Sequence, residues 1–336
     1  MKSKSTVVVV VLVLTMISII TALSGCVTDS NTDTSYEQSN SDQSQVKELK
    51  GTIRVSGAYA LYPMVIKWGE EYKKLHPKVN FDISAGGAGK GMADTVGGLV
   101  DIGMVSRPIA PAEEEKGAYW VTVTKDAVVP TVNKDNPVLD ELKANGLKRE
   151  VFEKIYINET TKTWGQATET GATDKINVYT RSDASGAAAT WAQYLGNNHQ
   201  EALNGVGVNG DPGLAEAIRQ DRLGIGFNNI VFAYDLNTRR PVDGIEIIPL
   251  DLNGNGIIDD DENFYATLDE MIEAVAAGKY PAPPARDQYL VTKGKPEGVT
   301  QDFIKWVLTD GQQYIQEVGY IVLSQDEISE GLEKIK

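Results

Sequence analysis

The chain has 336 residues, a formal net charge of −15 at pH 7 and a single cysteine. This length exceeds one small domain and suits two lobes, each with enough apolar residues for its own core. The acidic balance argues against nucleic acid and anionic lipid surfaces as partners, and one cysteine excludes a disulfide framework.

The N-terminal residues have the pattern of a secretory signal. Lys2 and Lys4 precede an apolar run over 7–23, which ends in small residues before Cys26. The tract after Cys26 is rich in Ser, Asp, Asn, Thr and Gln and holds too little apolar surface to fold. The sequence therefore predicts a signal peptide over 1–25 and a disordered linker over 26–49.

The segment Leu23-Ser-Gly-Cys26 resembles the lipobox of exported lipoproteins, in which the cysteine becomes the lipid-modified first residue. An uncleaved signal anchor is the alternative, because the apolar run is near the short end of a membrane span. We favour lipid attachment at Cys26, since no second cysteine can pair with it and a hydrophilic linker suits a tether.

Two segments early in the folded part share the order strand, glycine-rich loop and helix. The first has an alternating strand over 51–56, a loop over 57–62 and a helix that begins at Pro63. The second has a strand over 79–84 and a loop over 85–91 that opens another helix.

A third segment repeats this order with a strand over 176–180, a loop over 181–187 and a helix reaching residue 195. Arg181 supplies a cation, and Ser185 supplies a hydroxyl at the expected N-cap beside Gly186. Backbone N–H groups at a helix N-terminus lack partners and attract anions. An N-cap that binds no ligand would explain a single loop of this kind. Because three such loops occur in order along the chain, we instead predict that the protein captures an anion.

The remaining elements suggest a crossing between lobes. Ser106 and Arg107 end a strand within 100–108, where open α/β sheets build ligand sites. A β-rich stretch over 119–132 leads to a second lobe, and a strand over 288–292 returns to the first. Further helices are expected over 147–157, 213–222, 268–277, 299–308 and 312–318, with strands over 224–229 and 244–250.

Six motifs occur in an order that indicates a family. They are Ser-Gly-(x)5-Pro at 56–63, Gly-Gly-Ala-Gly-Lys-Gly at 86–91, Asp-Ile-Gly-Met-Val-Ser-Arg at 101–107, Arg-Ser-Asp-Ala-Ser-Gly at 181–186, Tyr-Leu-Val-Thr-Lys-Gly-Lys-Pro at 289–296 and Gly-Tyr-Ile-Val-Leu at 319–323. Together they resemble the phosphate-binding substrate proteins of phosphate ABC importers, over nearly all of 51–323.

This resemblance implies a type II periplasmic-binding-protein fold, in which two α/β lobes joined by two crossing strands close on one anion. Lobe 1 would comprise 50–126 plus 287–336, and lobe 2 would comprise 127–286. The implied protein is a monomeric, extracytoplasmic lipoprotein on the outer face of the cytoplasmic membrane. It would capture inorganic phosphate between its lobes and deliver it to an ABC permease.

The resemblance also implies a set of ligand-binding residues. In the family, the first loop would bind through backbone N–H groups, the second through a serine, and the strand end after Asp-Ile-Gly through a side chain. The Arg-(x)3-Ser-Gly-Thr loop would add a charge and a hydroxyl. Carried over to this chain, the set is Ala60, Leu61, Tyr62, Ala88, Gly89, Ser106 or Arg107, Arg181, Ser185, Gly186 and Ala187.

At three of these positions the chain lacks a hydroxyl that many family members have, namely Leu61, Ala88 and Ala187. A hydrogen bond to a charged group contributes roughly 1.5–3 kcal/mol, so phosphate binding would weaken unless other donors substitute. Arg107 stands where some members have an aspartate that accepts the proton of hydrogen phosphate. Sulfate, molybdate or tungstate are therefore alternative ligands, and a sensing or adhesive surface lipoprotein is the alternative outside transport.

Residues 251–262 match every fixed position of the EF-hand calcium loop. The segment before them is rich in β-branched residues and contains Pro249, which disfavours an entering helix. We predict a strand, calcium loop and helix insertion that binds calcium structurally, the alternative being a metal-free turn. The expected ligands are Asp251, Asn253, Asn255, the Ile257 carbonyl, Asp259 and Glu262.

No residue pattern indicates catalysis. The two histidines, His76 and His199, stand beside turn residues, and Cys26 belongs to the lipid junction. No spacing typical of a zinc site or a nucleophile triad occurs, and acidic pairs in so acidic a chain are expected to be solvated. We expect a binding protein and not an enzyme.

Replacing Cys26 by Ala removes the sulfur to which a lipid would be attached. We expect mature Cys26→Ala protein in the medium and wild-type protein in the membrane fraction, as measured by immunoblotting of both fractions. Unchanged membrane retention of the variant would contradict lipid attachment.

Overall fold

The computed structural model describes residues 48–336. The expected signal peptide, Cys26 and nearly all of the expected linker lie outside the described residues. Within 48–336, no helix is both long enough and apolar enough to cross a membrane.

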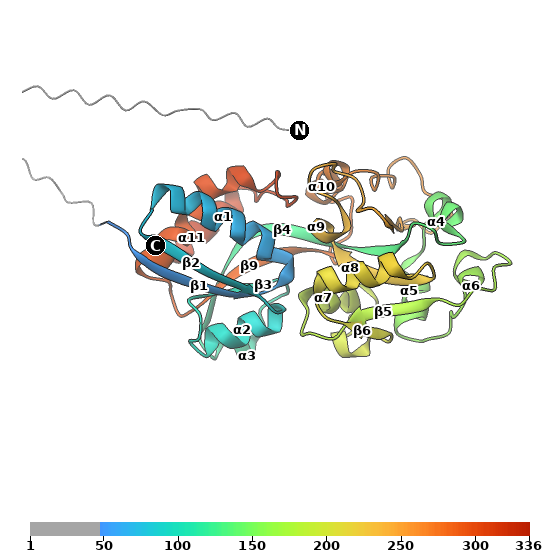
Figure 1. The fold of residues 1–336 in the computed structure, drawn as a ribbon, viewed down its shortest axis with the longest axis horizontal. Coiled ribbons are helices and arrows are strands. Elements are labelled where there is room, and N and C mark those ends of the chain that lie inside the picture. The colour runs from blue at the N-terminus through green and yellow to red at the C-terminus, as the bar shows by residue number, and fades with distance from the viewer. Residues whose placement is uncertain (1–47) are drawn as a thin grey trace, which may run out of the picture. The chain divides into compact units, whose positions relative to one another are not determined.

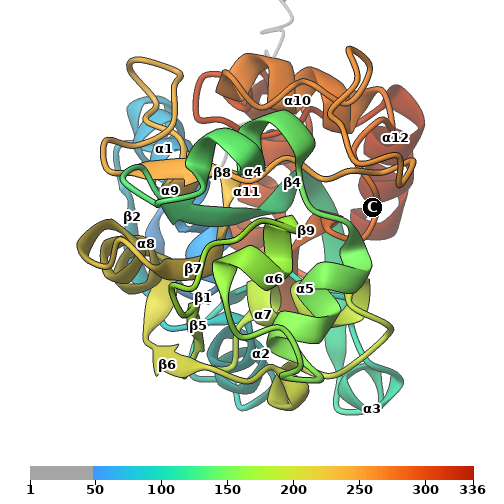
Figure 2. The ribbon, with the colours of Figure 1, turned by 90° about the vertical axis from the view of Figure 1, so that its right-hand side faces the viewer.

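The described residues build one mixed sheet with helices on both of its sides (Figures 1 and 2). The strand order is β2-β1-β3-β9-β4-β7-β5-β6, and β8 pairs with β4 off this path. The strands are β1 Gly51–Gly57, β2 Val79–Ala85, β3 Ile102–Val105, β4 Ala118–Asn133, β5 Asn177–Arg181, β6 Val206–Val208, β7 Gly224–Asn229, β8 Ile245–Ile247 and β9 Ala285–Lys293.

The helices divide between two lobes, which lie left and right in Figure 1. Lobe 1 contains η1 Tyr59–Leu61, α1 Tyr62–Leu75, α2 Ala88–Val96, α3 Pro111–Glu114, α11 Gly298–Leu308, η3 Asp310–Tyr314 and α12 Gln325–Ile335. Lobe 2 contains α4 Leu139–Asn145, α5 Arg149–Tyr156, α6 Trp164–Thr168, α7 Gly186–Tyr194, η2 Gln200–Ala202, α8 Gly210–Gln220, α9 Ile230–Ala233 and α10 Leu268–Ala276.

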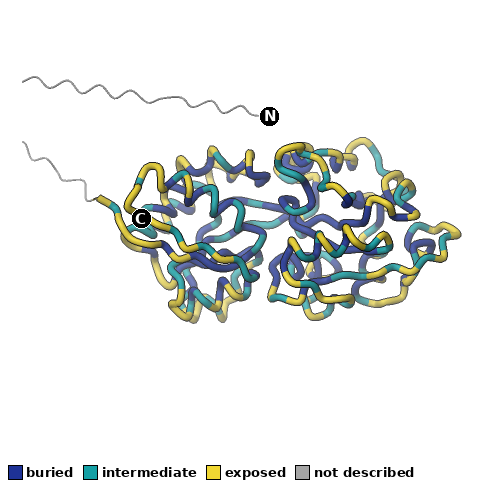
Figure 3. Tube along the Cα trace, viewed as in Figure 1, coloured by how far each residue is buried: buried dark blue, intermediate teal, exposed yellow. Residues whose placement is uncertain are grey.

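Strand β4 joins the lobes by changing its partners along its length. Residues 118–127 pair with β9, whereas 128–132 pair with β7 and 131–133 pair with β8 as well. This exchange lies next to the lobe boundary expected at residue 126. Buried backbone runs through both lobes and along the strands between them (Figure 3), so the predicted arrangement of two α/β lobes joined by two crossing strands is confirmed.

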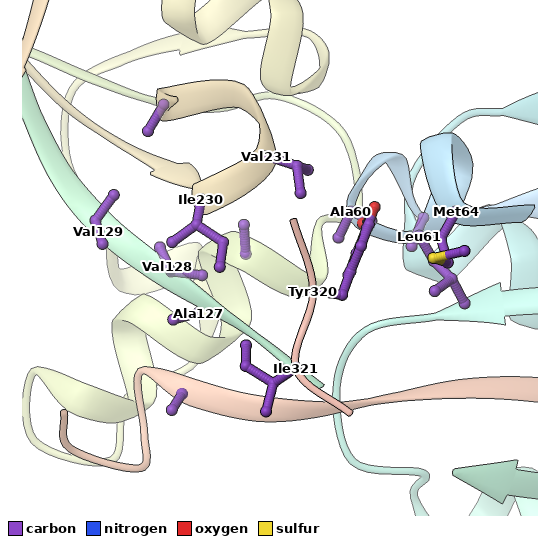
Figure 4. Packing of buried hydrophobic residues seen from close by; sticks show 14 of the residues in the cluster. Ala60, Leu61, Met64, Ala127, Val128, Val129, Ile230, Val231, Tyr320 and Ile321 are labelled. Atoms are coloured by element: carbon purple, nitrogen blue, oxygen red, sulfur yellow. The ribbon is translucent and has the colours of Figure 1, made fainter. Parts of the chain in front are cut away.

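A C-terminal segment also contacts both lobes. Ile321 exchanges backbone hydrogen bonds with Lys125 of β4 at 3.0 and 3.2 Å. The Tyr320 hydroxyl donates to the Ala60 carbonyl at 2.6 Å, and a Cβ on Gly319 would lie 3.3 Å from Val231 of lobe 2. Figure 4 shows these apolar residues of the two lobes packed around Tyr320.

Several expected elements differ in the structure. The helix expected over 312–318 is wrong, because this part of the chain is the 3-10 helix η3, which ends at Tyr314. Gln312 is buried there and its amide donates to the carbonyls of Val123 and Val307, so long-range contacts decide the local conformation. Helix α12 was not expected, although Ser324 and Glu327 form a capping box that the sequence displays.

The insertion expected around 251–262 also requires a correction. A strand precedes the loop, as predicted, but it is only β8 with three residues. No helix follows directly, because the chain after Glu262 runs irregularly until Thr267 caps α10. The capping box of Thr267 and Glu270 places the helix start there.

Candidate functional site

Helix N-termini from both lobes converge on a cleft between them. Lobe 1 contributes η1 and the start of α2, and lobe 2 contributes the starts of α7 and α8. Each start presents backbone N–H groups without intrahelical partners and the positive end of a helix dipole. The lining residues are Ala58, Tyr59, Ala60, Gly87, Ala88, Ser106, Arg181, Ser185, Gly186, Ala187, Asp211 and Asn229.

Glycines bring the lobe 1 loops into position. Strand β1 ends at Gly57, where a Cβ would lie 2.9 Å from the Met104 backbone nitrogen and 3.0 Å from the Gly91 Cα. Gly87 caps α2 with a φ of +92°, a conformation that favours glycine. The N–H of Ala88 therefore begins the helix at the cleft.

In lobe 2, Ser185 is the N-cap of α7, as predicted. Its hydroxyl accepts a hydrogen bond from the Ala188 N–H at 3.2 Å. This bond satisfies the third donor of the helix and leaves the N–H groups of Gly186 and Ala187 without intrahelical partners. Both residues line the cleft, so these two N–H groups are available to an anion.

Arg181 ends β5 and is the cation of the cleft. Its Nε and Nη2 donate to Asp183 at 2.8 and 2.7 Å, and its Nη1 donates to Asp211 at 2.6 Å. Burial alone lowers the pKa of Arg181, but the attraction of Asp211 and the hydrogen bonds to Asp183 outweigh burial and raise it. Arg181 therefore stays charged, and the two carboxylates hydrogen-bonded to it offset part of its attraction for an anion.

A chain of hydrogen bonds connects this cluster to the crossing strands. Asp211 accepts from the Asn229 side-chain amide at 2.7 Å, and Asn229 accepts from Arg286 of β9. Arg286 also donates to Asp126 at 2.8 Å, and these two residues face each other in the β4–β9 ladder. Burial raises the pKa of Asp126 against the opposing influence of Arg286. Arg181 and the two crossing strands, β4 and β9, thus belong to one buried polar network.

The lobes meet at glycine residues on the two sides of the cleft. A Cβ on Gly186 would lie 2.5 Å from the Ser106 carbonyl oxygen, and a Cβ on Gly89 would lie 2.5 Å from the Ala184 Cβ. The Gly89 N–H donates across the seam to the Ala184 carbonyl at 3.0 Å. The space that the lining residues leave between the lobes is small, about 140 Å³, and is partly open to solvent.

Seven of the predicted ligand-binding residues line this cleft and four do not. Ala60, Ala88, Ser106, Arg181, Ser185, Gly186 and Ala187 come together from both lobes, whereas Leu61, Tyr62, Gly89 and Arg107 lie outside.

The four exceptions have different physical reasons. Leu61 is fully buried in the apolar core, and Tyr62 begins α1 and packs against that core. Gly89 uses its N–H in the seam between the lobes. Arg107 binds both carboxylate oxygens of Glu113, at 2.9 and 2.7 Å, outside the cleft. Of the alternatives Ser106 and Arg107, the structure places Ser106 in the cleft.

Sequence reasoning missed five lining residues: Ala58 and Gly87, which lie in loops that it had recognised, and Tyr59, Asp211 and Asn229. Asp211 follows Gly210 at the start of α8, a glycine at a helix start that repeats the pattern of the other loops. Asn229 ends β7, which is the position where parallel strands build ligand sites. No local signal distinguishes Tyr59, because its role depends on residues of the other lobe.

A larger groove lies elsewhere, at the far end of lobe 1. Its walls combine apolar side chains such as Val299 and Ile335 with charges of both signs, including Lys305 and Asp302. These side chains come from α11 and α12 and present no converging helix N-termini. We therefore place the functional site in the cleft.

Comparisons with known proteins show which family the chain resembles. A family model described as a PBP superfamily domain matches residues 37–311. The phosphate-binding protein PstS of Staphylococcus haemolyticus is 24% identical over 310 residues, covering 89% of this chain and 90% of the relative. The protein of the same name from Methanocaldococcus jannaschii is also 24% identical, covering 97% of this chain and 94% of the relative.

Solved structures show the same fold. A Clostridium perfringens protein with bound phosphate has a TM-score of 0.65 at 22% identity and covers 82% of this chain and 100% of its own. An ABC-type phosphate transport receptor from Vibrio cholerae has a TM-score of 0.58 at 21% identity, covering 81% of this chain and 100% of its own.

Replacing Gly186 by Ala should prevent full closure of the lobes. The new Cβ would overlap Ser106, and overpacking of this kind costs about 1–3 kcal/mol. We expect spin labels on the two lobes to shift toward larger separations, measured in phosphate buffer and in phosphate-free buffer. Gly171→Ala is the control, because nothing lies within 4 Å of its Cβ. Unchanged distances in Gly186→Ala in both buffers would contradict the contact.

Proposed function

Because the chain belongs to the PBP superfamily, we propose that it is an extracytoplasmic substrate-binding protein that captures inorganic phosphate and delivers it to an ABC importer. The observation that carries this proposal is the convergence of helix N-termini from both lobes beside the buried cation Arg181. The names of the similar proteins from two bacteria and an archaeon support phosphate as the ligand. The proposal includes no catalytic step.

The missing hydroxyls weaken this proposal less than the sequence suggests. Leu61 lies in the core, so its side chain does not bear on the ligand. Ala88 and Ala187 face the cleft and still offer backbone N–H groups at the starts of their helices. Donors from N–H groups, together with Arg181 and the Ser106 hydroxyl, suit a small tetrahedral oxyanion whose oxygens all need partners.

There are two alternatives to this proposal, one with another ligand within the class of binding proteins and one from a different class. Sulfate, molybdate or tungstate would use the same N–H donors, since those groups do not themselves distinguish one oxyanion from another. A sensing or adhesive surface protein would use the same fold without a permease. A permease gene and an ATPase gene beside this gene would favour import, and an adjacent signalling gene would favour sensing.

We also propose that the mature protein is held at the outer face of the cytoplasmic membrane by a lipid on Cys26 and acts as a monomer. Support for the anchor comes from the lipobox-like sequence and from the Ser- and Asp-rich tract that follows it. The tract would let the folded lobes reach a membrane partner while the lipid holds the N-terminus.

We further propose that the loop over 251–262 binds Ca²⁺. Asp251 and Glu262 are about 95% buried, and their carboxylates accept hydrogen bonds from backbone N–H groups of the same loop. Within 48–336, no three His, Cys, Asp or Glu side chains lie close enough to hold a metal together. Amide oxygens of Asn253 and Asn255 and the Ile257 carbonyl would therefore have to complete the site.

Phosphate should stabilise the protein, and Arg181 should be required for its binding. We expect the melting temperature to rise more with phosphate than with sulfate, molybdate or tungstate, as measured by thermal denaturation with each anion. For Arg181→Ala we expect calorimetry to show phosphate affinity weakened by at least about 100-fold, because a charge-assisted donor is lost and two buried carboxylates face the anion.

Arg219→Ala is the matched control, since Arg219 also lies in lobe 2 but forms an exposed pair with Glu216. It should bind phosphate as the wild type does. Stabilisation by another anion and not by phosphate would refute the ligand assignment, and tight binding by Arg181→Ala would remove Arg181 from the site.

Calcium should bind to chelator-treated protein with measurable heat and should raise its melting temperature. At a calcium concentration of 100 times the dissociation constant, the free energy of unfolding should increase by about 2.7 kcal/mol. Glu262→Gln should lose this binding, because it keeps the size of the side chain and removes the charge at position 12 of the loop. Glu246→Gln, on the strand before the loop, is the control. No heat and no change in melting of the wild type would eliminate the calcium site.

A further inference from the structure

Tyr59 is the first residue of η1 in lobe 1, and its side chain contacts lobe 2. The centre of its ring lies 5.5 Å from the guanidinium carbon of Arg181. Its hydroxyl donates to the Asn209 side-chain oxygen at 3.4 Å. A Cβ on Gly210 would lie 2.9 Å from the ring. The ring therefore rests on the start of α8 and beside the buried cation.

The Tyr59 ring lies against the Arg181 guanidinium group in addition to its carboxylate partners. Asp183 and Asp211 occupy the edges of the guanidinium group through its N–H donors. A guanidinium group interacts with an aromatic ring by lying over the face of that ring. The Arg181 side chain is 1% exposed, whereas Tyr59 is half-buried, so the ring forms an outer wall of the cleft.

These contacts exist only when the lobes are closed. Tyr59 belongs to lobe 1, and Arg181, Asn209 and Gly210 all belong to lobe 2. Opening about the crossing strands would separate the ring from every one of them. A contact present in only one of two states shifts the equilibrium toward that state. Gly210, with a φ of +72°, provides both the turn and the space that the ring needs.

We propose that Tyr59 is a positioning residue that latches the lobes closed over the bound oxyanion and holds Arg181 in place. The proposal rests on the anion-binding function given above. The latch slows ligand release, because the lobes must lose the Tyr59 contacts before the anion can leave. Association starts from separated lobes and is affected little, as is usual for mutations within one interface.

The test compares Tyr59→Ala and Tyr59→Phe with the wild type by stopped-flow measurement of phosphate association and dissociation. Tyr59→Ala removes both contacts, and its dissociation rate should rise about tenfold, in the range expected for a lost cation–π contact. Tyr59→Phe keeps the ring on Arg181, and its rate should rise about twofold. The association rates and the melting temperatures of the ligand-free proteins should stay unchanged, which a merely structural role would not predict.

Tyr314 provides a matched control. Its ring lies 5.0 Å from the Lys67 ammonium nitrogen, and both residues belong to lobe 1. Tyr314→Ala thus removes a similar cation–π contact that does not connect the lobes, and phosphate should dissociate from it at the wild-type rate.

The outcomes separate the latch from the function on which it rests. If the wild type binds phosphate and Tyr59→Ala releases it at the wild-type rate, the latch is wrong and the proposed function stands. Equal acceleration in Tyr59→Ala and Tyr314→Ala would also overturn the latch. If the wild type binds no phosphate and no other oxyanion, the proposed function fails and the latch fails with it.

Discussion

A cation buried between two carboxylates is the interaction on which this structure depends. Arg181 is held by Asp183 and Asp211 from two sides, and a buried charge is tolerated only when it is paired and hydrogen-bonded. The pairing orients the guanidinium group rigidly. The carboxylates also offset the positive charge of Arg181, and the fold places the helix starts of α2 and α7 beside it in the cleft.

The hinge and the cleft are parts of one polar network. Asp126 and Arg286 face each other on the two crossing strands, and Asn229 links Arg286 to Asp211. Every member is buried or nearly so, which makes an unpaired group costly. The geometry of the crossing strands therefore bears directly on the position of Arg181. The contact of Tyr320 with Ala60 ties η1 to the same region from the other lobe.

Closure of the lobes depends on glycines at the contact between them. Gly89 and Gly186 let backbone and small side chains of the two lobes approach to contact distance. Gly89 lies in the first turn of α2 and Gly186 begins α7, and the absence of a Cβ at both positions permits the close approach. Such a cleft offers main-chain donors, so the proposed oxyanion site can have alanines at positions 88 and 187.

The sequence by itself determined the local units of this protein. Strand, glycine loop and helix can be recognised at 51–63, 79–91 and 176–195 because turns and caps use particular residues at fixed spacings. The ordered motifs then predicted the two lobes and seven residues that line the cleft. The sequence also contains the capping box that begins with Ser324, although α12 was not predicted.

Only the tertiary structure decided which side chains face the cleft. Arg107 ends a strand at the expected place but turns to Glu113, and Leu61 turns into the core. Tyr59 and Asn229 enter the site through partners far away in the chain, such as Arg181 and Arg286. The direction of a side chain follows from the charge or cavity that it meets across the fold, and no spacing within one segment encodes that partner.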